Sequence, residues 1–249
     1  MKKKYKLKKW IIYVFIIICL ITLIYSLINI IIWKINVDKN NSIKEEINNS
    51  SIKVNEDASS DEDKYEVDFN KLKELNNDTI AYLKVNNTNI DYVVVKGKDN
   101  SYYLTHNYNK DYNKSGWIFA DYHNKFDGSD KNIVIYGHNT ADGSMFGTLR
   151  SVYNKDWNDN LDNRIITLIT IDGTYFYQIF SSYNIEPEDY YINTEFNSNE
   201  EYSKFLKTIK SRSFYNYNTD VNINDTILTL SSCTSNGTKR VVLHAKKIN

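Results

Sequence analysis

The sequence predicts a mainly β domain that follows one transmembrane helix. The 249-residue chain contains 21 tyrosines and 10 phenylalanines but one proline, a composition that favours strands around a well-filled core. Short segments in which aliphatic and β-branched residues alternate with small or polar ones recur along the second two thirds of the chain. A long uncharged stretch precedes them near the N-terminus. The formal net charge is +0, so no global field indicates a nucleic-acid partner.

The N-terminal segment predicts a membrane anchor. Six lysines lie within residues 1–9, and residues 10–33 carry no charged side chain. At about 1.5 Å per residue, this run crosses a hydrocarbon layer of about 30 Å with some tilt. Trp10 and Trp33 mark the two interfaces, and the lysines are expected to stay cytoplasmic. We reject a cleavable signal peptide because the apolar run is too long and no small-residue cleavage pattern closes it. Everything after Lys34 is therefore expected outside the cytoplasm.

The next segment predicts a polar tether. Residues 36–66 are rich in Asn, Ser, Asp, Glu and Lys and contain only isolated apolar residues. Such a stretch buries too little surface to offset its ordering entropy, so we expect at most a fraying helical start. The predicted divisions are a cytoplasmic basic segment (1–9), an anchor (10–33), a tether (34–66) and a folded domain (67–249).

The folded domain is predicted to begin with a short helix and to continue mainly as strands. Phe69, Leu72 and Leu75 have the spacing of one helical face, which predicts a helix over 67–77. The Asp-Gly dipeptide at 172–173 is a strong hairpin signal. A helix with Asn or Ser placed to cap its start precedes the last hairpin. The other expected elements are strands over 79–85, 90–96, 117–121, 131–138, 164–170 and 175–183, a helical turn over 99–106, a helical segment over 145–153, and that late helix over 197–211.

The terminal hairpin is predicted to bring one cysteine and one arginine together. Its strands cover 227–232 and 240–244, and the linker 234–239 contains an Asn-Gly turn signal. In the register that sets Cys233 opposite Arg240, the two side chains project from the same face of the sheet. A neighbouring cation stabilises the thiolate, which is the nucleophilic form of cysteine.

The residues alone leave two interpretations of Cys233 open. Cys19 lies inside the predicted membrane span, so the exterior domain carries one unpaired thiol. A leftover cysteine in an exported protein indicates an intermolecular disulfide or a reactive thiol. The structural alternative is that Cys233 is a small buried hydrophobe and Arg240 a solvated strand residue.

Among the histidines, His138 is the first candidate to serve Cys233. It ends an apolar strand after Gly137, which we expect to permit a backbone turn, and functional groups are often displayed at strand ends. His244 would lie opposite Thr229, about 13 Å along the strand from the cysteine, and is excluded by that distance. The alternative for His138 is a hydrogen-bonded structural role. The other histidines lie in a polar helical turn and a loop, at His106 and His123.

These motifs together resemble the sortases, cysteine transpeptidases that attach exported proteins to the bacterial cell wall. The sequence around the cysteine is TLSSC followed by Arg240, and the sequence around His138 is YGHN. The N-terminal anchor is also typical of the family. The resemblance covers the chain from about Phe69 to its C-terminus.

Within the family, the chain looks most like class B. The supporting stretches are NTNIDYVVVKGKDNSYYL at 87–104 and GWIFADYHN at 116–124. The late helix also supports class B, because a class A enzyme would be expected to lack it. Three positions depart from the usual pattern, which weakens inferences about substrate contacts more than about the chemistry. The usual threonine before the cysteine is Ser232, a common proline is Val93, and the basic residue often found at the position of His123 is absent.

The resemblance implies a closed eight-stranded β-barrel with the site at one end of a groove. It implies that Cys233 attacks the Thr–Gly or Thr–Asn carbonyl of a C-terminal sorting signal to form a thioester, and that a peptidoglycan precursor amine resolves this thioester. His138 would act as acid and base, and Arg240 would hold the substrate carbonyl or oxyanion. No cofactor or metal is expected. By resemblance alone the groove would be lined by Asn100, Leu104, Ser231 and Ser232.

Several alternatives stay open at this point. Leu104 could be a core residue, and the two serines ordinary strand residues. Another exported Cys/His wall enzyme, either an L,D-transpeptidase or a papain-like peptidase, would share the chemistry. However, the first usually places its histidine and cysteine closer in sequence, and the second places its cysteine before its histidine. The alternative outside the enzymes is a membrane-tethered binding module with an incidental thiol. The expected partners are surface proteins with a sorting motif, the precursor amine and the membrane around residues 10–33.

Overall fold

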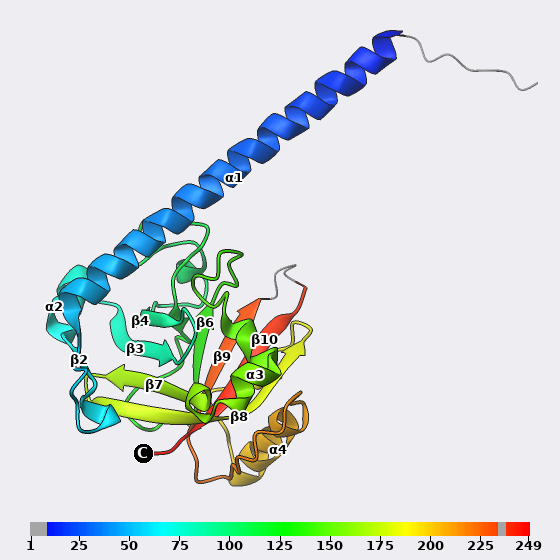
Figure 1. The fold of residues 1–249 in the computed structure, drawn as a ribbon. Coiled ribbons are helices and arrows are strands. Elements are labelled where there is room, and N and C mark those ends of the chain that lie inside the picture. Colours follow the sequence, from blue (N-terminus) through cyan, green and yellow to red (C-terminus); the bar gives the residue numbers. More distant parts are fainter. Residues whose placement is uncertain (1–8, 234–237) are drawn as a thin grey trace, which may run out of the picture.

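Eight strands close into one barrel at the centre of the molecule (Figure 1). The computed structural model describes residues 9–233 and 238–249, and only the backbone of Cys233. Neighbouring strands follow the order β10-β8-β7-β3-β4-β5-β6-β9. The closed eight-stranded barrel implied by the resemblance is therefore confirmed. Most of the predicted basic segment (1–8) and the Asn-Gly turn at 236–237 lie outside the described residues.

The barrel strands are β3 (Thr79–Val85), β4 (Asp91–Val95), β5 (Phe119–Ala120), β6 (Asn132–Gly137), β7 (Ile165–Thr170), β8 (Gly173–Ile185), β9 (Ile227–Cys233) and β10 (Arg240–Lys247). A separate antiparallel pair consists of β1 (Ile52–Val54) and β2 (Tyr65–Val67). The α-helices are α1 (Lys9–Ser51), α2 (Phe69–Leu75), α3 (Lys155–Asp159) and α4 (Asn199–Ser211). Short 3₁₀ helices are η1 (Asp61–Asp63), η2 (Tyr102–Leu104), η3 (Leu149–Tyr153), η4 (Leu161–Arg164) and η5 (Tyr190–Ile192).

The two predicted hairpins form in the barrel. Strands β7 and β8 join at Gly173, whose φ of 145° is a conformation that favours glycine. Strands β9 and β10 pair in the predicted register, with Cys233 opposite Arg240 and His244 opposite Thr229. On its other side, β9 pairs in parallel with β6. Strand β9 is therefore flanked by the two elements that carry the other candidate residues.

Helix α4 covers one side of the barrel (Figure 1). The Oγ atom of Ser198 accepts a hydrogen bond from the backbone N–H of Glu201, so the predicted cap is present. The apolar stripe packs in one cluster with residues of β8 and β10, including Phe180 and Val242. Burying each such large side chain stabilises the fold by about 1.5–3 kcal/mol. The buried stripe consists of Tyr202, Phe205, Leu206 and Ile209.

The segment expected to be a tether is largely folded, so that expectation is wrong for its structure. Helix α1 continues without a break from the apolar run to Ser51. Its side chains Val37, Ile43 and Ile47 are buried, and Ile43 and Ile47 belong to the cluster that fills the barrel. After α1 the chain forms β1, which pairs with β2. Figure 1 shows α1 running along the domain before it projects away from it.

Polar contacts explain why this segment is ordered despite its composition. Asn113 Nδ2 donates to Asn36 O and to Asn40 Oδ1, both over 2.8 Å. Asn40 Nδ2 donates to Gly116 O over 2.9 Å, and Lys39 pairs with an aspartate of the same loop. The partners lie 72 to 77 residues away in sequence. Counting apolar residues in the segment alone therefore underestimates what holds it.

Smaller differences concern the ends of elements. Leu75 was predicted to share the buried face of its helix, but it lies in the last turn of α2 and is 52% exposed. Strand β5 contains two residues instead of the five predicted. Met145 has a positive φ of 49°, so the helical segment predicted from this residue begins later, as η3.

Candidate active site

Three neighbouring strand ends bring the candidate catalytic residues to one end of the barrel. Gly137, the last residue of β6, pairs with Ser232, so His138 and Cys233 follow at the same level. On the other side of β9, Arg240 is the register partner of Cys233. Adjacent strands lie about 4.8 Å apart, so the three backbones are close together. His138 is far from the other two residues in sequence, and the parallel pairing of β6 with β9 brings it beside them.

A pocket of about 260 Å³ opens at this end of the barrel. His138 and Arg240 both line it. The four groove candidates line it too: Asn100, Leu104, Ser231 and Ser232. Sequence reasoning missed other residues of its wall, among them Phe119, Tyr136, Glu188, Asp189, Tyr191 and Ile192. A separate pocket of about 210 Å³ lies near Phe126 and Lys247 and contains none of the candidate residues.

The ring of His138 is fixed by one backbone contact. Its Nε2 lies 2.8 Å from Leu104 O. A carbonyl oxygen only accepts hydrogen bonds, so Nε2 carries the proton of this contact. The remaining ring nitrogen, Nδ1, is therefore the atom that can give and take a proton.

Gly137 is required by close packing and not by a turn, so the expected reason for this glycine is wrong. Its φ is not positive, and it lies within strand β6. A Cβ at this position would lie 2.5 Å from Ile118 Cδ1 and 2.7 Å from Phe146 Cγ. A side chain here would displace the strand end that carries His138.

Arg240 is half-buried beside an acidic stretch of the pocket wall. Its Nη1 donates a long hydrogen bond of 3.4 Å to Lys239 O. Glu188 and Asp189 line the same pocket, and Glu188 forms an ion pair with Arg212 over 3.6 Å. A guanidinium in such a wall can hold a carbonyl or an oxyanion with a planar pair of N–H groups.

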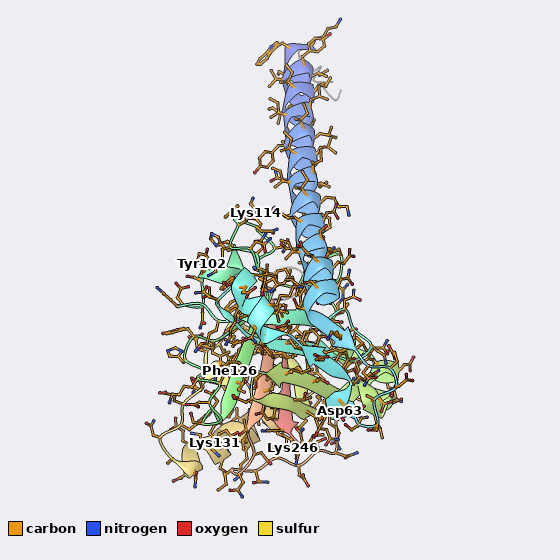
Figure 2. All side chains as sticks on the ribbon, turned by 90° about the vertical axis from the view of Figure 1, so that its left-hand side faces the viewer. Asp63, Tyr102, Lys114, Phe126, Lys131 and Lys246 are labelled. Atoms are coloured by element: carbon orange, nitrogen blue, oxygen red, sulfur yellow. The ribbon has the colours of Figure 1, made fainter. Side chains whose placement is uncertain are left out.

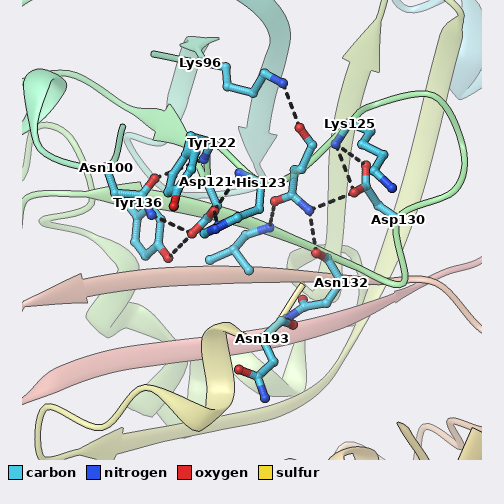
Figure 3. Close-up of polar contacts among 12 residues, drawn as sticks. Lys96, Asn100, Asp121, Tyr122, His123, Lys125, Asp130, Asn132, Tyr136 and Asn193 are labelled. Atoms are coloured by element: carbon cyan, nitrogen blue, oxygen red, sulfur yellow. Dashed lines mark hydrogen bonds and ion pairs between the residues drawn. The ribbon is translucent and has the colours of Figure 1, made fainter. Parts of the chain in front are cut away.

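A buried carboxylate organises the opposite wall, as Figure 3 shows. Asp121 Oδ2 accepts hydrogen bonds from Asn100 Nδ2 and from the Tyr136 hydroxyl, each over 2.7 Å. Asp121 Oδ1 accepts from His123 Nδ1 over 2.8 Å. Asn100 Oδ1 accepts in turn from Tyr122 N–H over 3.0 Å. Burial, and secondarily Asp121, raises the pKa of Tyr136, so its hydroxyl stays protonated.

This network fixes what two pocket residues can offer a ligand. Within the described residues, Asn100 uses one amide N–H and one lone pair of its carbonyl oxygen, so its second N–H and second lone pair can serve a ligand. The Tyr136 proton is directed at Asp121, so its oxygen can only accept. Asp121 and Tyr136 were missed because a loop aspartate and a strand tyrosine have no sequence signal of function. The only available hint was the GWIFADYHN stretch that contains Asp121.

His244 is a buried structural residue. Its Nδ1 lies 2.9 Å from Thr229 Oγ1, and its Nε2 lies 2.9 Å from the Tyr183 hydroxyl. The Thr229 hydroxyl donates to Asn132 Oδ1, so it accepts from His244 Nδ1. Burial lowers the pKa of His244 to about 3, and the ring is therefore neutral.

The other two histidines lie outside the pocket lining. His106 Nδ1 contacts Tyr102 O over 2.8 Å, and its ring stacks on Tyr102. His123 holds the outer side of Asp121. Within residues 9–233 and 238–249, no group of three or more His, Cys, Asp or Glu side chains is placed to hold a metal ion.

Comparison with known proteins identifies the family. A family model described as Sortase domain matches residues 83–248. Sortase B of Listeria monocytogenes is 39% identical over 162 residues, which are 65% of this chain and 65% of that protein. Sortase B of Staphylococcus aureus is 33% identical over 183 residues, which are 72% of this chain and 74% of that protein.

Solved structures agree with the sequence matches. Sortase B of Bacillus anthracis superposes with a TM-score of 0.75 and 31% identity, covering 86% of this chain and 99% of that chain. Sortase B of Clostridium perfringens superposes with a TM-score of 0.69 and 38% identity, covering 73% of this chain and 100% of that chain. The closed barrel, the late helix α4 and these matches lead to one conclusion: the chain belongs to the sortase family of cysteine transpeptidases and is most similar to class B.

Proposed function

We propose that this protein is a membrane-anchored transpeptidase that cleaves a C-terminal sorting signal after Thr and transfers the protein to a peptidoglycan precursor amine. The observation that carries the proposal is the meeting of His138, Cys233 and Arg240 at three adjacent strand ends beside one pocket. Membership of the sortase family supports it. The solved complex of Staphylococcus aureus sortase B with a substrate belongs to a protein that is 33% identical to this chain.

In the first half-reaction, the Cys233 thiolate attacks the carbonyl carbon of the peptide bond after Thr. The C–N bond breaks, a thioester forms on the sulfur, and the leaving amine takes a proton from His138. In the second half-reaction, an acceptor amine loses a proton to His138 and attacks the thioester. The sulfur leaves as thiolate, so the enzyme returns to its initial state with a new amide bond formed.

Arg240 is assigned to the oxygen of the attacked carbonyl. This oxygen becomes negatively charged in the tetrahedral state, where a fixed donor can contribute about 3 kcal/mol. Toward residues 9–233 and 238–249, the Arg240 guanidinium makes one long hydrogen bond, from Nη1 to Lys239 O, which leaves most of its donors for a substrate.

The groove is assigned to Asn100, Leu104, Ser231 and Ser232, which all line the pocket. Leu104 is 39% exposed, so its side chain is not a core residue. Ser231 is buried and contacts the Tyr191 hydroxyl over 3.0 Å, so it supports the wall through a second pocket residue. Asn100 offers one N–H to the substrate backbone or side chain.

Helix α1 is assigned to the membrane over residues 10–33. It is long and apolar enough to span a bilayer, and residues 9–33 project away from the domain (Figure 1). The cytoplasmic N-terminus and the extracytoplasmic domain follow from the basic residues before the span. This location would place the active site where exported proteins and the wall precursor meet.

The proposal is tested with a panel of short peptides that carry different sorting signals, with and without an added amine. We expect cleavage after Thr, a thioester on Cys233 that hydroxylamine releases, and an amide product when the amine is present. Cys233→Ala should give none of these products. If no peptide of the panel were cleaved and Cys233 were alkylated as slowly as an ordinary thiol, the result would support the binding module instead.

A further inference from the structure

We propose that the loop over residues 107–116 lies against the surface of the membrane that holds α1, and that the catalytic pocket opens on this membrane side. The inference rests on the membrane anchoring proposed above and adds a contact surface to it. The partner is the headgroup layer of the bilayer.

The distance along α1 is the first argument. The uncharged run ends at Trp33, and α1 remains helical beyond it. The first contact with the domain comes at Asn36, whose carbonyl accepts from Asn113 Nδ2 over 2.8 Å. The next residue, Val37, is already buried, with an exposed fraction of 2%. At about 1.5 Å per residue, Val37 lies about 6 Å beyond Trp33. The loop therefore begins within roughly one helical turn of the bilayer boundary.

The second argument is that no linker separates the span from the domain. Asn40 Nδ2 donates to Gly116 O over 2.9 Å, and Lys39 pairs with Asp111 over 2.8 Å. Further along, Ile43 and Ile47 are buried in the same core as the barrel. A helix held at successive turns transmits its orientation to the domain, so the domain cannot stand away from the membrane on a flexible segment.

The exposed side chains of the loop suit such a surface. Tyr112 is 64% exposed, and Lys110 and Lys114 are exposed as well. Tyrosine and lysine are residue types that favour the region between hydrocarbon and water. Figure 2 shows Lys114 next to α1, at the end of the domain from which the helix emerges.

Hydrogen bonds connect this loop to the catalytic pocket. Asn113 N–H donates to Thr105 O over 2.8 Å, and the neighbouring Leu104 O contacts His138 Nε2 over 2.8 Å. Figure 1 shows that α1 leaves the domain toward the same side as the barrel end where β9 ends and β10 begins. A substrate that is itself held in the membrane would present its cleavage segment to this side.

The experiment uses the full chain in nanodiscs of phosphatidylcholine and phosphatidylglycerol that contain a headgroup spin-labelled lipid. In a background with Cys19→Ser and Cys233→Ala, one fluorophore is attached in turn through Lys114→Cys, Lys34→Cys or Asp63→Cys. Lys34 reports the end of the span, and Asp63 lies on the domain well away from the projecting part of α1 (Figure 2). We expect quenching at position 114 within about twofold of that at position 34, because about one turn separates their levels. Quenching at position 63 should be absent.

A second variant controls for the length of α1. Inserting seven helix-forming residues after Lys34 should move the domain about 10 Å farther from the membrane. Seven residues make nearly two whole turns, so the rotation of the domain about the α1 axis should stay nearly unchanged. Quenching at position 114 should then fall to the level of position 63. In the protein without the insertion, quenching at position 34 but not at position 114 would overturn the proposed membrane contact of the loop and would still support the anchor. Loss of quenching at 34 would instead overturn the anchoring itself.

Discussion

His138 and His244 belong to the same three-strand unit but have opposite environments. His138 follows the end of β6, lines the pocket and, among the described residues, makes one hydrogen bond, through Nε2. His244 lies in the middle of β10, is fully buried, and uses both ring nitrogens. Burial lowers the pKa of His244 to about 3, so it cannot exchange protons near neutral pH. Position along a strand therefore decides which histidine is available for chemistry and which one supports the core.

The largest expected effect on turnover comes from replacing His138, and replacing His244 in the same way tests the comparison directly. His138→Ala should lower kcat/KM by about 10³-fold, because it removes the proton donor and acceptor while changing little of the core. His244→Ala should leave kcat/KM of the folded protein nearly unchanged. It should lower the free energy of unfolding by about 3 kcal/mol, because it leaves a cavity and removes one buried hydrogen bond from each of two hydroxyls, those of Thr229 and Tyr183. Peptide turnover and urea unfolding measure both quantities.

The comparison would fail if folded His244→Ala turned over peptides as slowly as His138→Ala. That result would mean that the buried ring takes part in catalysis, and the role assigned to strand position would be withdrawn.

Arg240→Lys should lower kcat/KM by about 10²–10³-fold, with Arg240→Ala lower still. Lysine keeps the charge but loses the planar pair of donors that can hold a carbonyl oxygen. The rate of Cys233 alkylation against pH is the control, because it reports thiolate formation without the transition state. Nearly normal kcat/KM in Arg240→Lys would show that charge alone is sufficient.

Asp121→Asn should lower kcat/KM by about tenfold, mainly through KM. The amide has one acceptor oxygen where the carboxylate has two, so it cannot accept from Asn100, Tyr136 and His123 together. The pocket side chains therefore lose part of their fixed orientation. Asp127→Asn is the matched control, because Asp127 is exposed and, within the described part of the chain, its side chain accepts hydrogen bonds from Ser129 alone. Equal losses in the two variants would contradict a positioning role for Asp121.

The last prediction concerns the stability of the protein at low pH and involves no change in turnover. The folded pKa of His244 is lowered from 6.5 to about 3, so the unfolded chain binds the proton first as pH falls. The free energy of unfolding should therefore decrease below about pH 6.5, by about 1.4 kcal/mol per unit until the folded pKa is reached. The measurement is the difference between the natural protein and His244→Gln, which removes the contribution of other groups. Equal slopes for the two proteins would contradict the assignment.

The terminal hairpin was the part of the site that the sequence predicted well. Alternation in two segments and a turn signal between them predicted the hairpin, and the register that was considered for it, with Cys233 opposite Arg240, is the one that forms. The strand ending at His138 was also predicted, but its parallel pairing with β9 was not. Parallel partners are joined by long connections, so no local signal reports which strands meet.

Two other features escaped prediction because their partners are distant. The part of α1 that packs on the domain has only three buried apolar residues, Val37, Ile43 and Ile47. Its packing also depends on hydrogen bonds to a loop more than seventy residues away in sequence. Asp121 resembles any solvated loop carboxylate until the barrel brings Asn100 and Tyr136 to it. Patterns within one segment carry no information about such pairs.

The position of β9 between β6 and β10 also sets when the active site can appear during folding. The segment that closes the barrel, residues 227–247, follows all the other barrel strands in the sequence. Until this segment pairs with them, β6 and β8 each have an unpaired edge, and Cys233 does not lie beside the end of β6. Pairing across such long sequence separations is a slow step of folding. Barrel closure and assembly of the reactive thiol with its partners are therefore one event, so an incomplete chain has no assembled nucleophile.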